Sequence, residues 1–324
     1  MSTRAVAACA LAAAVMLPGP GLASAGERFA LVVSGASGGE PYAAQYDKWR
    51  QALVTSLLDR LALRPDRLFV LAERDGDGAK RATRENVQVA LGEVRRRMMR
   101  DDQLLVALIG HGTFDGAVAK FNLVGPDLDA AEWAALLKPL PGRVVFVDTT
   151  GASFPFLAEI SARGRVVVTA TDSVAQRYET VFPEFFVNAL DDLAADLDKN
   201  GRVSVLEAFG YASTGVRRWF EERGQLATER PLLDDNGDGI GREAGLPGPD
   251  GALARATYLD PDVPAALAGD SSLGALLKRR AALEAEIEAL KEKKGSMPPD
   301  QYEAELEKLL VELARVSRQI RVKS

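Results

Sequence analysis

The chain has 324 residues, of which 47% are hydrophobic and 27% are charged. This is an ordinary globular composition, with enough apolar side chains for one large core or two smaller ones. The formal net charge is −6 and the basic residues are dispersed, so nothing in the charge pattern suggests a nucleic-acid partner.

Residues 1–25 have the features of an export signal. Arg4 provides a positive start, and the apolar run from Ala5 to Leu17 is too short to span a bilayer. Ala23-Ser24-Ala25 fits the small-x-small pattern that precedes signal cleavage. We therefore expect a mature chain that begins at Gly26 and is periplasmic or secreted from a bacterium. No later apolar run is long enough for a transmembrane helix.

Cys9 is the only cysteine, and it lies inside the expected signal. After cleavage the protein would have no thiol, no disulfide and no cysteine metal site. Cys9 also allows a lipoprotein signal, but this is the weaker interpretation because only four residues separate Arg4 from the cysteine.

Strand and helix patterns alternate along the first half of the chain. We expect strands at 29–34, 68–72, 104–109, 144–147 and 165–170, and helices at 42–63, 84–99 (capped by Thr83), 130–137 and 154–161. This alternation predicts an α/β domain with a mainly parallel sheet and helices on both faces.

The second half is predicted to contain fewer strands. Helices are expected at 182–194 and 205–222, an acidic glycine-rich loop at 232–241 and a linker at 247–270. Apolar seams at 271–294 and 299–322 predict two helices that fold back as an antiparallel coiled-coil hairpin. The expected domains are thus 26–246 and 271–324. The hairpin either binds a partner, for example a second copy, or closes on itself.

Residues 196–207 match a twelve-residue EF-hand calcium loop. Oxygen-bearing side chains stand at positions one, three, five, nine and twelve, and position seven contributes a backbone carbonyl in such loops. The candidate ligands are therefore Asp196, Asp198, Asn200, Arg202, Ser204 and Glu207. Gly201 permits the sharp turn at position six, and a helix is expected on each side. We predict that this loop binds Ca²⁺ and serves folding rather than signalling.

A second acidic loop has ligand-like spacing at Asp234, Asn236 and Asp238. Its twelfth position is Gly245 instead of glutamate. A second ion is one interpretation, and a plain turn rich in Asp and Asn is the favoured one.

Polar loops follow two of the buried strands. The strand at 104–109 is followed by His111, the only histidine, and the strand at 144–147 is followed by Asp148, Thr149 and Thr150. Parallel strands carry their functional residues at the carboxyl edge, so His111 and Thr150 are expected to meet there.

These two strand ends resemble the legumain branch of the caspase-like cysteine peptidases, over about residues 28–190. The resemblance implies a caspase-like sheet in which His111 is the general base. The position of the family's nucleophilic cysteine falls on Thr150, or on Thr149 if the loop shifts by one residue. Ser37 stands where the family has an asparagine that assists the histidine, and residues 169–173 are similar to the strand that lines its substrate pocket.

The departure from the family lies at the nucleophile. A threonine hydroxyl needs a strong, well-placed base, whereas a cysteine is already partly ionised near neutral pH. The β-branch of Thr150 also crowds a site shaped for a thiol. We therefore predict an exported, inactive peptidase homologue that binds calcium and acts as a peptide-binding, protein-binding or scaffolding module.

Two other functions stay open. The first is an active hydrolase in which Thr150 is the nucleophile, His111 the base, and Ser37 and Asp148 support them. The second is a calcium-dependent structural protein that assembles through its hairpin. His111 itself could also be a loop histidine that only bonds neighbouring backbone.

Overall fold

The computed structural model describes residues 26–176, 179–261 and 297–323, together with residues 276, 279, 280, 282, 283, 286, 287 and 290. The expected signal at 1–25 and most of 262–296 lie outside the described residues. The strands are β1 (Arg28–Ser34), β2 (Leu68–Ala72), β3 (Lys80–Arg81), β4 (Gln103–Ile109), β5 (Gly112–Phe114), β6 (Ala119–Phe121), β7 (Leu128–Asp129), β8 (Arg143–Asp148), β9 (Arg165–Thr169) and β10 (Leu232–Asp234). The α-helices are α1 (Glu40–Thr55), α2 (Arg84–Arg97), α3 (Ala130–Leu137), α4 (Phe154–Ile160), α5 (Phe182–Ala189), α6 (Val205–Glu222), α7 (Ala252–Arg255) and α9 (Pro299–Lys323).

The main sheet has the strand order β10-β9-β8-β4-β1-β2-β3. All neighbours are parallel except β10, which pairs antiparallel with β9. β4 lies beside β8 with Val106 opposite Phe146, so the loops after these two strands emerge at the same edge. The predicted mainly parallel sheet is confirmed.

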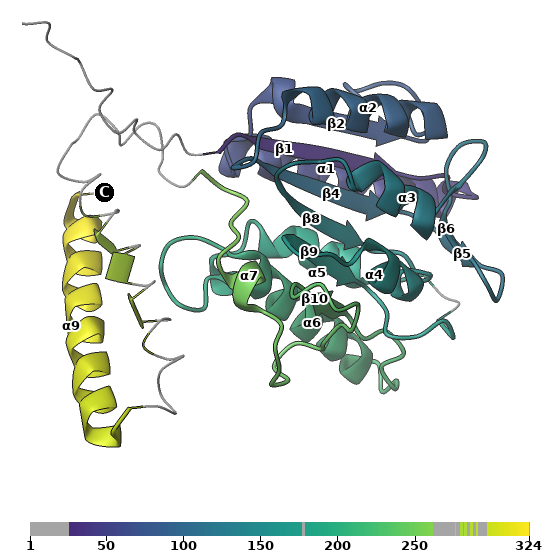
Figure 1. Cartoon of the computed structure of the whole chain (residues 1–324). Coiled ribbons are helices and arrows are strands. Elements are labelled where there is room, and N and C mark those ends of the chain that lie inside the picture. The colour runs from purple at the N-terminus through teal and green to yellow at the C-terminus, as the bar shows by residue number, and fades with distance from the viewer. Residues whose placement is uncertain are drawn as a thin grey trace, which may run out of the picture.

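Helices cover both faces of this sheet (Figure 1). Phe29, Leu31 and Val33 of β1 pack in the core beneath α2, α3 and α4. The alternate residues Ala30 and Val32 pack in the core beneath α1, α5 and α6. Because side chains alternate along a strand, a strand covered on both faces must be apolar at every position. This explains the continuous apolar runs in the sequence.

Several elements differ from the sequence prediction. The helix expected at 182–194 ends at Ala189 and is followed by a 3₁₀ turn at Leu193–Ala195. The helix expected at 42–63 passes into a π-helical turn at Ser56–Arg60. The acidic loop expected at 232–241 begins as the edge strand β10. A small antiparallel sheet, β5-β6-β7, follows β4 and was not predicted.

The first part of the segment expected to be a linker packs against the α/β domain. It forms α7, and Ala254 and Leu259 are buried in the same core as α6. Val205 donates a backbone hydrogen bond to Thr257 at 2.8 Å, and Ser204 forms a β-bridge with Tyr258. Residues 247–261 are therefore folded onto the domain, and residues 262–270 lie outside the described part.

Near the C-terminus, α9 contacts residues of the preceding segment. Leu283 is buried in a cluster with Val316 and Ile320. Arg279 donates to Glu312 at 2.8 Å, which adds a polar contact beside this apolar cluster. Leu273, which the predicted seam includes, lies outside the described residues.

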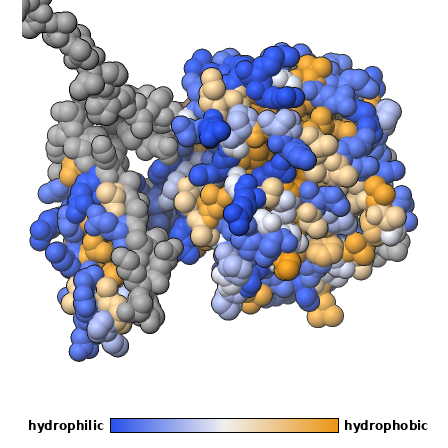
Figure 2. Space-filling view, in the orientation of Figure 1, coloured by the Kyte–Doolittle hydropathy of each residue, from blue (hydrophilic) through white to orange (hydrophobic). Residues whose placement is uncertain are grey.

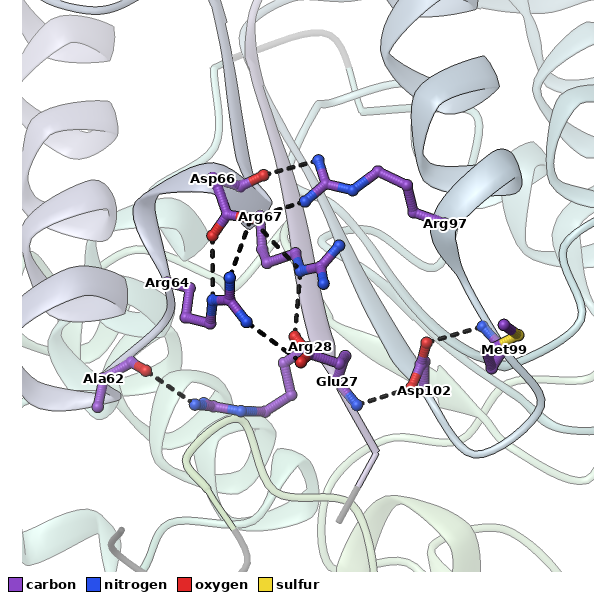
Figure 3. A network of polar contacts seen from close by, with 9 residues as sticks. All are labelled: Glu27, Arg28, Ala62, Arg64, Asp66, Arg67, Arg97, Met99 and Asp102. Carbon is purple, nitrogen blue, oxygen red and sulfur yellow. Dashed lines mark hydrogen bonds and ion pairs between the residues drawn. The ribbon is translucent and has the colours of Figure 1, made fainter. Parts of the chain in front are cut away.

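Ion pairs fasten the amino ends of β1 and β2, at the edge opposite the loops after β4 and β8 (Figure 3). Glu27 accepts hydrogen bonds from Arg64 at 3.3 Å and from Arg67 at 3.0 Å. Arg97, the last residue of α2, donates to Asp66 at 2.8 Å. The acidic partners Glu27 and Asp66 are exposed to solvent, so each pair contributes little to stability and mainly fixes the positions of the chain segments.

The surface is mixed in character. On the face shown in Figure 2, hydrophobic residues are interspersed with hydrophilic ones. Among the residues that the structure describes, no helix is long and apolar enough to cross a membrane.

Candidate functional site at the ends of β4 and β8

His111 follows β4 directly and leads into β5. Its ring meets Tyr42 edge-on, with ring centroids 4.8 Å apart, and Tyr46 at 5.4 Å. Both tyrosines belong to α1, so the amphipathic helix that covers the sheet also holds the imidazole. In the described part of the chain, the imidazole makes ring contacts but no side-chain hydrogen bond. Its backbone carbonyl accepts from Asn122 at 3.0 Å.

Glu179 is a neighbour that the sequence did not single out. It follows β9, and burial raises the pKa of its carboxyl above the usual range, while Tyr46 and the charge of His111 act in the opposite direction. Glu179 Oε1 and the Tyr46 hydroxyl are both buried without a hydrogen bond of good geometry. In the sequence, the only feature that could have indicated a role for Glu179 is its position in the loop that follows a strand of the sheet.

Thr150 lies at the end of β8 and is closed off from solvent. The residue is 1% exposed, and its Oγ1 has no hydrogen-bond partner of good geometry. A Cβ added to Gly112 would lie 2.6 Å from this hydroxyl. His111 and Thr150 thus occupy adjoining strand ends, as expected, but His111 makes no hydrogen bond to the threonine hydroxyl.

Asp148 is fully buried beneath Thr150. Burial raises the pKa of its carboxyl to about 7, although the backbone N–H and the hydroxyl of Thr150 lower it. The N–H of Thr150 donates to Oδ1 at 2.9 Å, and Oδ2 has no partner of good geometry. Near neutral pH this side chain is therefore only partly ionised, and it contacts Thr150 rather than His111.

The neighbouring hydroxyls hold the strand ends together. Thr149 donates through Oγ1 to the carbonyl of Leu108 at 2.7 Å and accepts at its own carbonyl from Thr180. Ser153 Oγ accepts from the N–H groups of Ala170 at 3.1 Å and Thr171 at 3.2 Å. These bonds use the hydroxyls of Thr149 and Ser153 to position the loops.

Ser37 bonds away from the histidine. Its hydroxyl donates to Glu73 Oε2 at 2.9 Å, and its N–H lies 3.3 Å from Glu73 Oε1. The resemblance gives this position a role in assisting His111, whereas here it orients a carboxylate at the end of β2.

A buried glutamate fastens the loop that carries Glu179. Glu229 accepts from the N–H groups of Val181 at 2.9 Å and Phe182 at 2.7 Å, at the start of α5. Burial raises its pKa to about 7, and the two hydrogen bonds only partly oppose this. The arrangement satisfies backbone donors that the start of a helix leaves free.

The loop at 196–207 brings its acidic side chains together. Asp196, Asp198 and Glu207 each offer an oxygen, and these oxygens all lie within 4.8 Å of one another. Burial and, next, the nearby charge of Glu207 raise the pKa of Asp198, as expected for carboxylates held close together. Oxygen-rich sites of this kind suit Ca²⁺, whose charge would relieve the repulsion.

The backbone of this loop also has the required turns. Gly201 has φ of 86° and Lys199 has φ of 59°, and Ser204 and Glu207 form a capping box at the start of α6. Asn200 donates its side-chain amide to the Tyr258 hydroxyl at 3.1 Å, and the Arg202 side chain lies over the Tyr258 ring. Only the backbone carbonyl of Arg202 would be a ligand in such a loop.

The second acidic loop forms a compact turn. Asp234 accepts from the N–H groups of Gly237 at 2.9 Å and Gly239 at 2.6 Å, and from Ser161 Oγ at 2.7 Å. Asn236 and Asp238 bond to each other at 3.0 Å. Comparable hydrogen bonds hold the oxygens of Asp196 and Asp198 in the first loop, so these bonds do not distinguish an ion site from an Asp- and Asn-rich turn.

No protein-family model matches the chain, and a comparison with curated proteins finds no match. Among solved structures, protein GSU0716 from Geobacter sulfurreducens is 14% identical, with 72% of this chain and 99% of that chain covered and a TM-score of 0.45. The Drosophila initiator caspase Dronc is 12% identical, with 66% and 81% covered and a TM-score of 0.43. Likenesses of this order concern the general course of the backbone.

Proposed function

We propose that this protein is a non-hydrolysing, caspase-like peptidase homologue of the legumain type that binds extended peptides. One observation supports an inactive site: the hydroxyl at the nucleophile position belongs to a threonine that is 1% exposed and packed on Gly112. A nucleophile must reach its substrate and have a base within hydrogen-bond distance. Thr150 does not meet the first requirement, and the carboxyl beside it, that of Asp148, is also buried.

The edge strand β5 supports the peptide-binding part of the proposal. It begins directly after His111, and its neighbour in the small sheet is β6 alone. His111 and Asp115 hydrogen-bond to Asn122 and Val118 across this pair. Because the pattern alternates, the backbone groups of Gly112 and Phe114 point away from β6. An extended peptide could pair with them and lie beside His111 and Tyr42.

The test is a binding and cleavage assay on the exported form, residues 26–324, with calcium and a mixed library of extended peptides. We expect bound peptides that remain intact. Phe114→Pro removes an outward N–H and should abolish binding, whereas the matched variant Phe114→Ala keeps the N–H and should retain most of it. Absence of any bound peptide would refute the binding role.

The rival hydrolase predicts a different result in the same assay. Cleavage that disappears in both Thr150→Ala and His111→Ala would show that Thr150 is a nucleophile with His111 as its base. In that case the buried position of Thr150 would have to open before reaction.

Calcium binding at 196–207 is part of the same proposal. It is supported by the convergence of Asp196, Asp198 and Glu207 and by the turn at Gly201. The proposal that the protein is exported is supported by the signal-like residues 1–25. An exported protein without a thiol cannot form disulfides, and a bound ion would stabilise its fold instead.

The C-terminal helices are proposed to form an antiparallel hairpin. Leu283 packs with Val316 and Ile320, and Arg279 pairs with Glu312. Elsewhere on α9, Leu310 and Val311 are about half exposed. Assembly through this helix predicts a dimer or larger species on gel filtration with calcium, and a monomer would argue against it.

A further inference from the structure

A cavity of about 210 Å³ lies beside α1, apart from the peptide edge proposed above. One wall is the α1 face that carries Ala43, Tyr46, Asp47 and Arg50, and the other is formed by residues 34–37 and 72–77 after β1 and β2. The volume is below that of sites for drug-sized ligands, so an occupant must be smaller than a drug molecule.

Arg50 is a nearly buried cation in this wall. Its side chain is 6% exposed, while that of its partner Asp47 is 54% exposed. Nε and Nη2 both donate to the same oxygen, Asp47 Oδ1, at 3.2 and 3.0 Å. A guanidinium has five N–H donors, and within the described residues Nη1 has no partner. Its planar edge is suited to a carboxylate, which would satisfy these donors.

The Tyr46 ring lies in the same wall of the cavity. Tyr46 is 2% exposed, and its Oη has no hydrogen bond of good geometry. Buried polar groups of this kind are normally paired with protein, water or ligand. The Tyr46 hydroxyl interacts with Glu179, outside the cavity, so Arg50 is the group that indicates a polar occupant.

The opposite wall favours positive charge. Glu73 is oriented by two hydrogen bonds from Ser37, and Asp75 and Asp77 lie beside it. The lining has four carboxylates, counting Asp47, against two arginines, Arg50 and Arg74. A simple anion is therefore disfavoured, and a ligand needs a cationic group as well as an anionic one.

We propose that this cavity binds a free α-amino acid, with its carboxylate on Arg50 and its ammonium group near Glu73. The apolar surfaces of Ala43, Ala72 and the Tyr46 ring leave room for a small side chain. Binding of this ligand does not depend on the peptide-binding role, since neither His111 nor β5 lines the cavity.

The test is calorimetric titration of residues 26–324 with three probes of one side chain: the free L-amino acid, its N-acetyl derivative and its amide. A panel of side chains is used for the free form. We expect binding of at least one zwitterion and at least about tenfold weaker binding of both blocked forms, because each lacks one charged group. Equal binding of the N-acetyl form would overturn the zwitterion assignment.

Two variants test the residues. Arg50→Met and Glu73→Gln should each weaken binding by about tenfold or more, whereas Arg96→Met, on an exposed arginine far from the cavity, should change it less than about twofold. Glu73→Gln is isosteric, so it still tests the proposed binding site if Arg50→Met fails to fold. The proposal is wrong if no amino acid binds at millimolar concentration, or if binding survives Glu73→Gln unchanged.

Discussion

The Thr150 side chain packs directly on the Cα of Gly112, which lies on the neighbouring strand end. A Cβ added to Gly112 would lie 2.6 Å from Thr150 Oγ1 and 2.9 Å from Ala152 Cβ. This contact closes the space in which an attacking hydroxyl would need to move. The contact can be tested by replacing Gly112 with alanine, which adds a single carbon atom at this point.

Gly112→Ala should therefore destabilise the fold. Overpacking of this kind costs about 1–3 kcal/mol in the free energy of unfolding, because Thr150 and Ala152 are only 1% and 6% exposed and have little room to shift. Urea unfolding measures the difference. Gly92→Ala is the control, since a Cβ there meets nothing within 4 Å and lies inside α2, where alanine should stabilise. Equal stability of the two variants would contradict the close contact.

Thr149→Val should cost more stability than Thr150→Val although the residues are adjacent. Thr149 Oγ1 donates to Leu108, so its loss should cost about 1 kcal/mol or more. Thr150 Oγ1 has no hydrogen bond of good geometry and only favours the ionised form of Asp148, so the isosteric valine should cost clearly less. Thermal melting of both variants measures this. A large loss for Thr150→Val would show that its hydroxyl has a structural partner.

Stability should fall as pH rises from about 4 to about 7. Asp148 has a pKa of about 7 in the folded protein, against an ordinary value of 3.8. As pH rises, the carboxyl therefore loses its proton in the unfolded chain before it does so in the folded protein. The stabilisation that this difference provides is fully present only below about pH 4. The loss is at most about 4.5 kcal/mol for this residue, taking about 1.4 kcal/mol for each of the roughly 3.2 pKa units.

Asp148→Asn should remove this part of the pH dependence. The amide oxygen can still accept from Thr150, and no charge is buried above pH 4. Unfolding curves at about pH 5 and pH 7.5 should show a smaller difference for the variant than for the native protein. Glu229→Gln serves as a second variant, because Glu229 also has a pKa near 7 and should contribute in the same window. An unchanged slope in Asp148→Asn would mean that this carboxyl is already ionised in the folded state.

Calcium should raise the melting temperature. A loop of this kind in an exported protein is expected to bind with a dissociation constant of about 0.1–1 mM, so about 10 mM calcium should add roughly 1 kcal/mol or more. Glu207→Gln should abolish the shift, because Glu207 supplies carboxylate oxygens to the cluster. Asp238→Asn, in the second acidic loop, should keep it. A shift that persists in Glu207→Gln would place the ion elsewhere.

The central sheet could be predicted because its strands are apolar on both faces. β1, β4 and β8 were recognisable from runs such as Val144–Val147 alone. β5, β6 and β10 are three residues long, so they carry no periodicity. The residues of β10 were expected to form a loop, and no element was predicted for β5 or β6. The segment at 247–261 is rich in Gly, Pro and Asp, yet it buries Ala254 and Leu259 against helices distant in sequence.

The site was predictable only where a strand end fixes it. His111 and Thr150 follow neighbouring strands, and this was sufficient to bring them to one edge. The contacts of His111 with Tyr42 and Tyr46, and the pairing of Ser37 with Glu73, depend on how α1 and the β2 loop fold over that edge. Glu179 and Glu229 lie in irregular loops, and no local sequence pattern predicts that such loops fold close to the site.

Tyr258 links the acidic loop to the stretch that precedes the C-terminal helices. Its hydroxyl accepts from Asn200, its backbone pairs with Ser204, and Asp260 pairs with Arg202 at 2.8 Å. Calcium scarcity would therefore loosen residues 257–261 before the rest of the core and offer them to a protease. Limited digestion with a chelator should therefore release the C-terminal helices as a separate fragment, whereas digestion with calcium should not. Bound calcium would then protect residues 257–261 from proteolysis.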